Sequence, residues 1–104
     1  MTSSRFVVLQ ESPNTATRPN GANARAKLSK LLGEFDQVTV DMSGFVLTPS
    51  FADEFLGVLL AELGEARFRQ KVRIENVSDS ARPLLQTVLQ RRATPEHPVQ
   101  WRHA

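Results

Sequence analysis

The chain of 104 residues contains no cysteine, which excludes a disulfide framework, a thiolate zinc site and a cysteine nucleophile. Its two histidines, His97 and His103, stand six positions apart in a proline-broken tail, a spacing that fits no zinc motif. The apolar run at 6–9 is too short for the core of a signal peptide, and no stretch approaches the length of a membrane span. We therefore predict a cytoplasmic protein without a metal site.

Signatures of catalysis are also missing. There is no glycine-rich phosphate loop, no Ser-His-Asp arrangement and no nucleotide-binding fingerprint. The length suits one domain, 1–104, with its core at about 5–92 and little room for a deep substrate cleft. These observations predict a protein that is not an enzyme and holds no cofactor. One catalytic alternative stays open, a small hydrolase or transferase that uses Asp41, Ser50 and Asp53.

Positive charge is concentrated in the second part of the chain. Residues 1–66 hold five basic and eight acidic side chains, whereas residues 67–104 hold eight basic and three acidic ones. A basic half can attract phosphate backbones, but no block of Lys and Arg with interleaved aromatic residues is present. A solvated basic surface is the preferred interpretation, and a nucleic-acid-associated accessory role is the alternative.

Hydrophobic periodicity predicts a small α/β domain. Strands are expected at 5–10, 37–42 and 71–77, and the last two alternate apolar and polar residues, which is typical of a sheet with one wet face. In the third strand, Val72 and Ile74 should be buried while Lys71, Arg73 and Glu75 face solvent. The polar stretch 11–23 is expected to be a loop, and residues 99–102 a short edge strand in the tail 93–104.

Three helices are expected between and after these strands. The first carries an apolar stripe from Ala24 to Phe35. The second is expected to begin at Ser50, three residues before Asp53 in a capping-box pattern, and to end at Gly64. The third should begin near residues 78–80. Strands separated by helices run parallel, so we predict a small, mostly parallel sheet with helices mainly on one face.

Two stretches carry a family resemblance. VTVDMSGF at 38–45 and TPSFADEFLG at 48–57 resemble the core of the STAS-like domains, small bacterial domains of largely uncharacterised function. Residues 17–21 and 74–78 resemble that family as well, so that the resemblance covers about 18–92. It implies a STAS-like fold and a regulatory protein that docks to a cytoplasmic signalling partner and acts by partner switching.

The same layout is similar to the wider STAS fold of anti-sigma-factor antagonists and sulfate-transporter tails. In those proteins an Asp-Ser pair opens the corresponding helix and carries a phosphorylatable serine, around which a histidine-kinase-like ATPase docks. The resemblance places Ser50 at the serine position, with Pro49 in place of the aspartate and Phe51 in place of a small residue. Ser50 is thus a candidate phosphoacceptor, and an N-cap serine is the structural alternative.

The working surface implied by this resemblance is the loop and helix at 48–61. On a helical projection Asp53, Gly57 and Ala61 share a face outside the apolar stripe, where a strip of small residues admits close approach of another backbone. An internal packing role for Gly57 is the alternative. The candidate docking residues are Thr48, Phe51, Asp53, Glu54, Gly57, Val58 and Ala61.

Three further candidates lie near strand ends and loops. Asp41 ends a strand at the edge where functional groups of open α/β sheets gather. It either supports the Ser50 loop or pairs with Lys71 or Arg73 on the wet face of the sheet. Arg18 and Asn20 lie in the polar stretch expected to form a loop. The sequence names no small-molecule substrate and no membrane partner.

Overall fold

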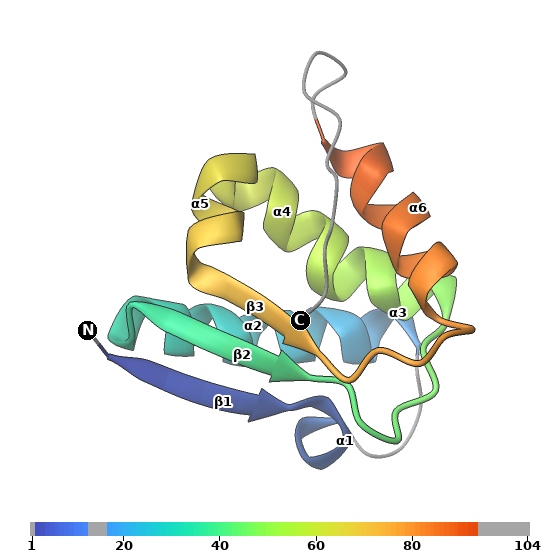
Figure 1. Cartoon of the computed structure of the whole chain (residues 1–104), viewed down its shortest axis with the longest axis horizontal. Coiled ribbons are helices and arrows are strands. Elements are labelled where there is room, and N and C mark those ends of the chain that lie inside the picture. The colour runs from blue at the N-terminus through green and yellow to red at the C-terminus, as the bar shows by residue number, and fades with distance from the viewer. Residues whose placement is uncertain (1, 13–16, 94–104) are drawn as a thin grey trace.

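A computed structural model describes residues 2–12 and 17–93 of the chain (Figure 1). Strands and helices alternate along most of it, and one π-helical turn interrupts the helical segment at 49–63. The elements are β1 (Ser3–Val7), α1 (Val8–Glu11), α2 (Arg18–Glu34), β2 (Gln37–Asp41), α3 (Pro49–Ala52), η1 (Asp53–Gly57), α4 (Val58–Leu63), α5 (Glu65–Lys71), β3 (Val72–Glu75) and α6 (Arg82–Arg92).

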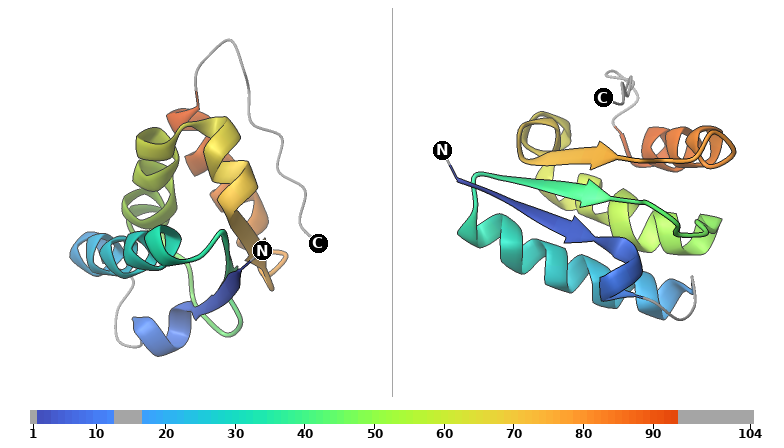
Figure 2. Two further views of the ribbon diagram at one scale, coloured as in Figure 1. Left: turned by 90° about the vertical axis from the view of Figure 1, so that its left-hand side faces the viewer. Right: turned by 60° about the horizontal axis from the view of Figure 1, so that its bottom comes forward.

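The three strands form one parallel sheet in the order β1-β2-β3. Figure 2 shows α2 and the α3–η1–α4 segment on one face of this sheet. The alternation of apolar and polar residues in β3 matches their burial, because Val72 and Ile74 are buried whereas Arg73 is exposed. The prediction of a small parallel sheet with helices mainly on one face is confirmed. No helix in the described part of the chain is both long and apolar enough to cross a membrane.

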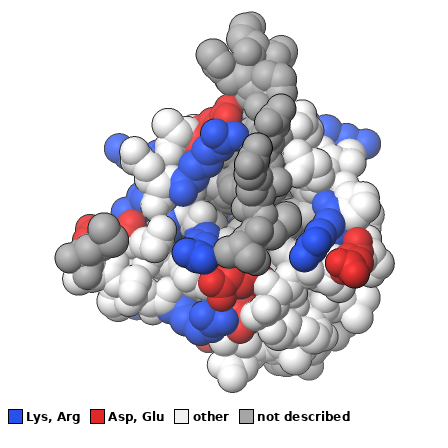
Figure 3. Space-filling view, viewed as in Figure 1, with Lys and Arg blue, Asp and Glu red and all other residues white. Residues whose placement is uncertain are grey.

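Charged side chains of both signs gather on the other face of the sheet, over the strands (Figure 3). Arg5 pairs with Asp41 and with Glu75, and Arg73 pairs with Glu75 at 3.1 Å. Glu75 is therefore only partly exposed. Lys71 is half-buried too, because its ammonium group donates to the carbonyl of Phe35 at 3.3 Å.

The prediction for residues 5–23 is wrong in two places. The first strand begins at Ser3 and ends at Val7, and the chain then turns helically from Val8, which is fully buried. The polar stretch does not stay a loop, because α2 already begins at Arg18. Thr17 caps it, its side chain accepting a hydrogen bond from the backbone N–H of Asn20.

The first turn of α2 shows no apolar periodicity in the sequence, because a glycine makes its contact with the neighbouring helices. Gly21 is buried against α3 and η1, where an added Cβ would lie 2.9 Å from the carbonyl oxygen of Phe51 and 2.9 Å from the Cβ of Glu54. Two backbones approach closely there without a large apolar side chain. Hydrophobic periodicity alone misses such a turn.

Two other boundaries differ from expectation. Residues 65–71, for which no helix was expected, form α5 after Gly64, whose φ of +85° ends α4. The last helix begins at Arg82, because the hydroxyl of Ser78 accepts from the backbone N–H of Ala81 and holds a turn before it. The edge strand expected at 99–102 and both histidines lie outside the described residues.

Candidate partner-docking surface

The first turn of α3 is capped by Thr48 and not by Ser50. The Thr48 hydroxyl accepts from the backbone N–H of Phe51 at 3.3 Å, and Pro49 occupies the first helical position. Proline is tolerated there because its missing N–H has no helical partner in any case. The capping-box prediction for Ser50 is therefore wrong, since the N-cap lies two positions earlier. The Ser50 side chain is exposed and does not cap the helix.

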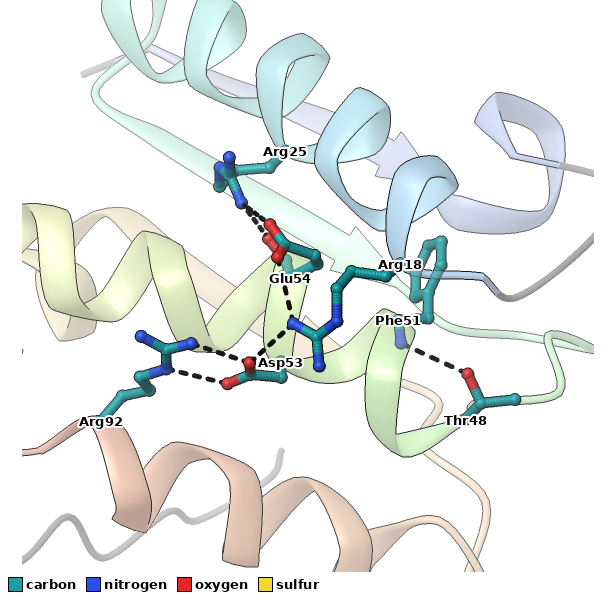
Figure 4. A network of polar contacts seen from close by, with 7 residues as sticks. All are labelled: Arg18, Arg25, Thr48, Phe51, Asp53, Glu54 and Arg92. Atoms are coloured by element: carbon teal, nitrogen blue, oxygen red, sulfur yellow. Dashed lines mark hydrogen bonds and ion pairs between the residues drawn. The ribbon is translucent and has the colours of Figure 1, made fainter.

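Asp53 and Glu54 are held by arginines from two other helices (Figure 4). Arg92 of α6 donates two hydrogen bonds to Asp53, from Nε to Oδ1 at 2.8 Å and from Nη2 to Oδ2 at 2.7 Å. Arg18 of α2 reaches both carboxylates, at 3.1 Å and 3.0 Å, and Arg25 lies 2.7 Å from Glu54. Both predicted docking residues thus join helices within the domain.

These contacts favour the charged form of both carboxylates. The hydrogen bond from Arg92, with a smaller contribution from Arg18, lowers the pKa of Asp53 to about 2. Arg25 and then Arg18 lower the pKa of Glu54 in the same way. A carboxylate with such a low pKa is a weak base at neutral pH and a poor proton donor.

Phe51 and Gly57, two of the predicted docking residues, are buried. A Cβ added to Gly57 would lie 2.8 Å from Oδ1 of Asp53 and 3.2 Å from atoms of both Val88 and Arg92. The glycine therefore allows α6 to approach η1, and the prediction that it faces outward is wrong. The π-helical turn at Asp53–Gly57 explains the error, because it breaks the 3.6-residue period on which the helical projection rests.

The remaining residues of the predicted surface are accessible. Thr48 and Val58 are half-buried, and Ser50 and Ala61 are exposed. Asn20 is half-buried in the first turn of α2, and so does not lie in a loop.

A groove of about 290 Å³ opens beside Ser50, where the first turns of α2 and α3 meet the last turn of α6. We call it the basic groove, because three of its seven lining residues are arginines and only one is acidic. Arg18, Pro49, Ser50, Asp53, Val88, Arg91 and Arg92 line it. Sequence reasoning missed the arginines at the end of α6 as site residues, although the Arg91-Arg92 pair itself is a visible signal.

Asp41 organises the loops that follow β2 and β3. Its Oδ1 accepts from the backbone N–H of Ser43 at 2.9 Å and from the side-chain amide of Asn76 at 3.0 Å, while Oδ2 accepts from Arg5. The hydrogen bonds from Asn76 and Ser43 are the largest causes that hold its pKa well below the ordinary range. The cation that pairs with Asp41 is thus Arg5, and the predicted pairing with Lys71 or Arg73 is wrong.

Those two loops enclose a second groove, of about 360 Å³, which we call the apolar groove. Most of its lining is hydrophobic, and Val46 at its side is 79% exposed. Gly44 gives the loop its sharp exit from β2 with a φ of +69°. The lining residues are Met42, Gly44, Phe45, Val46, Leu47, Asn76, Ser78, Ser80, Ala81 and Leu84.

Comparison with protein families gives one match. Residues 20–82 match the model of the STAS-like domain of unknown function (DUF4325). The chain belongs to this STAS-like family. The match includes the apolar-groove loops and Ser50, whereas Arg18, Arg91 and Arg92 lie outside it, so the basic groove of this STAS-like domain combines matched and unmatched residues. Comparisons with curated proteins and with solved structures each gave no match.

Proposed function

We propose that this STAS-like domain is a non-enzymatic regulatory module of bacterial signalling that docks to a cytoplasmic partner protein. The docking surface is the part of residues 43–61 that remains accessible, centred on the loop that bears Val46. A histidine-kinase-like ATPase is the class of partner suggested by analogy with the wider STAS fold.

The exposure of Val46 beside the apolar groove is the observation that carries this proposal. A single exposed apolar side chain is ordinary, but here Phe45, Leu47 and Leu84 continue the apolar surface into a groove. Serine and asparagine side chains complete its lining. Apolar surface rimmed by polar groups is typical of protein-interaction sites.

A non-catalytic role is supported by the state of the two carboxylates in the enzyme hypothesis. Asp41 and Asp53 are both engaged by arginines, and their lowered pKa values oppose proton transfer near neutral pH. Asp41 also does not line the groove that contains Ser50 and Asp53. The three residues therefore offer no obvious base for the Ser50 hydroxyl.

Site-specific photo-crosslinking in the native cells tests the proposal. A photoreactive amino acid replaces Val46, and the matched control places it at Gln70, an exposed position on α5. We expect one protein to crosslink at position 46 and not at 70. That protein, once purified, should bind the domain, and Val46→Asp should weaken the binding by placing an unpaired charge in an apolar contact. Equal crosslinking at both positions, or none, would contradict the proposal.

Ser50 is the residue through which we propose that docking is regulated. Its side chain is exposed and lines the basic groove, so that a phosphate on its hydroxyl would lie near Arg18 and Arg92. Mass spectrometry of the protein from native cells tests this directly. Absence of a Ser50 phosphate under all growth conditions would remove the regulatory role.

A further inference from the structure

The basic groove carries more positive charge than its one carboxylate balances. Asp53 is shared between Arg18 and Arg92, and the third arginine, Arg91, is exposed at the same groove. Arg91 forms no ion pair with any other residue that the structure describes. The groove therefore keeps unbalanced positive charge at an accessible place.

Arginine is suited to accept a second anion here. A guanidinium group has five N–H donors in a fixed planar arrangement. Asp53 takes two donors of Arg92 and one of Arg18, and Glu54 takes a further donor of Arg18. The remaining donors, with all those of Arg91, match the paired oxygens of a carboxylate.

Among the residues that the structure describes, most of the other arginines in the basic part of the chain have a carboxylate partner, so the unbalanced charge at the groove is local. Elsewhere on the same part of the chain, Arg69 pairs with Glu65, Arg73 with Glu75 and Arg82 with Asp79. A nucleic-acid backbone, with its regular series of phosphates, is bound by an extended basic surface. A compact basic groove is complementary to a short run of carboxylates.

We infer that the basic groove binds an acidic segment of the partner protein, with Asp or Glu carboxylates of that segment accepting hydrogen bonds from Arg91 and Arg92. This inference rests on the proposed function and adds the chemistry of the partner. Val88 and Pro49 in the lining give the methylene groups of such side chains an apolar contact. Asp53 competes with the incoming carboxylates for Arg18 and Arg92.

Fluorescence anisotropy with a labelled Glu-rich peptide tests the inference on the purified full chain. A peptide with Gln in place of Glu is the ligand control. We expect the acidic peptide alone to bind, with an affinity that falls as salt is raised. Arg91→Gln should weaken binding several-fold and Arg91→Glu should abolish it, whereas Arg82→Gln, on the same helix but outside the groove, should leave it unchanged.

Asp53→Asn supplies a change in the opposite direction. Loss of the competing carboxylate should strengthen peptide binding several-fold, at a temperature where thermal melts show the variant to be folded. Equal effects of the Arg91 and Arg82 changes, or no binding of the acidic peptide, would overturn the inference. Tighter and Arg91-dependent binding of an oligonucleotide of equal charge would also overturn it, in favour of phosphate recognition.

The two proposals can fail separately. If the partner crosslinked at Val46 binds Arg91→Gln normally, the inference about the basic groove fails while the proposed function stands. If no partner crosslinks at Val46 while the acidic peptide binds through Arg91, the docking loop fails and the anion site stands.

Discussion

Residues 43–61, which contain the docking surface first expected at 48–61 and the loop before it, divide into two unlike parts. Its loop part, residues 43–50, leaves Val46 and Ser50 exposed beside the two grooves. Its helical part, residues 51–61, buries Phe51 and Gly57 and commits Asp53 to Arg92. A distinctive sequence stretch thus mixes residues that build the domain with residues that remain available to a partner.

The largest effect expected from this contrast follows from enlarging Gly57 in the helical part. Gly57→Arg should lower the free energy of unfolding by at least the ~1–3 kcal/mol typical of overpacking. Its Cβ would lie 2.8 Å from Oδ1 of Asp53 and 3.2 Å from Val88. Asp53 cannot move aside without losing its hydrogen bonds to Arg92. Denaturant unfolding followed by circular dichroism measures the change.

Gly33→Arg is the matched control, because nothing lies within 4 Å of a Cβ added at this exposed helical position. Replacing glycine by a good helix former should there raise stability by up to about 1 kcal/mol. If both variants unfolded at the same denaturant concentration as the wild type, Gly57 would not be a packing residue and an outward-facing role would return.

The loop part offers a pair of neighbours with different expected effects. Thr48→Ala should lower the free energy of unfolding by about 1 kcal/mol, because it removes the cap on the backbone N–H of Phe51. Ser50→Ala should change it by less than ~0.5 kcal/mol, since its side chain is exposed and caps nothing. Chemical denaturation of the two variants side by side decides which residue is the cap. A larger loss from Ser50→Ala would restore the capping-box interpretation.

The smallest effect concerns the dependence of stability on pH at Asp53. Its pKa is lowered from 3.8 to about 2 in the folded protein, so its stabilising contribution is present above about pH 4. That contribution is lost as the pH falls through about 2 and the carboxylate takes up a proton. The pair is partly open to solvent, so its contribution is modest.

Asp53→Asn isolates this contribution from the other titrating groups. The wild type should be more stable than the variant at pH 7, and the gap should close between about pH 4 and pH 2. Thermal melts of both proteins over this range provide the comparison. A gap that stays constant with pH would show that the Arg92–Asp53 contact contributes through packing and not through charge.

Much of the fold follows from local pattern. Alternation in the second and third strands determined which side chains face the core, and the apolar stripes placed the middle of each long helix. The stretches at 38–45 and 48–57, which carry the resemblance to the STAS-like family, lie within the part of the chain that matches it. Boundaries failed where one residue type can serve two purposes, as when Thr48 and Ser50 are both good helix caps and only one has the backbone geometry to act as one.

What the sequence by itself determined is the α/β class, the parallel sheet with one charged face, and the residues worth testing around Ser50. Only the tertiary structure decided which of those residues are available. The reason is that Gly21 takes its role from α3 and η1, while Gly57 and Asp53 take theirs from α6 and α2. These elements are distant in the chain, and no local period encodes their approach. The basic groove likewise exists only because folding brings Arg18 and Arg92 to the same carboxylate.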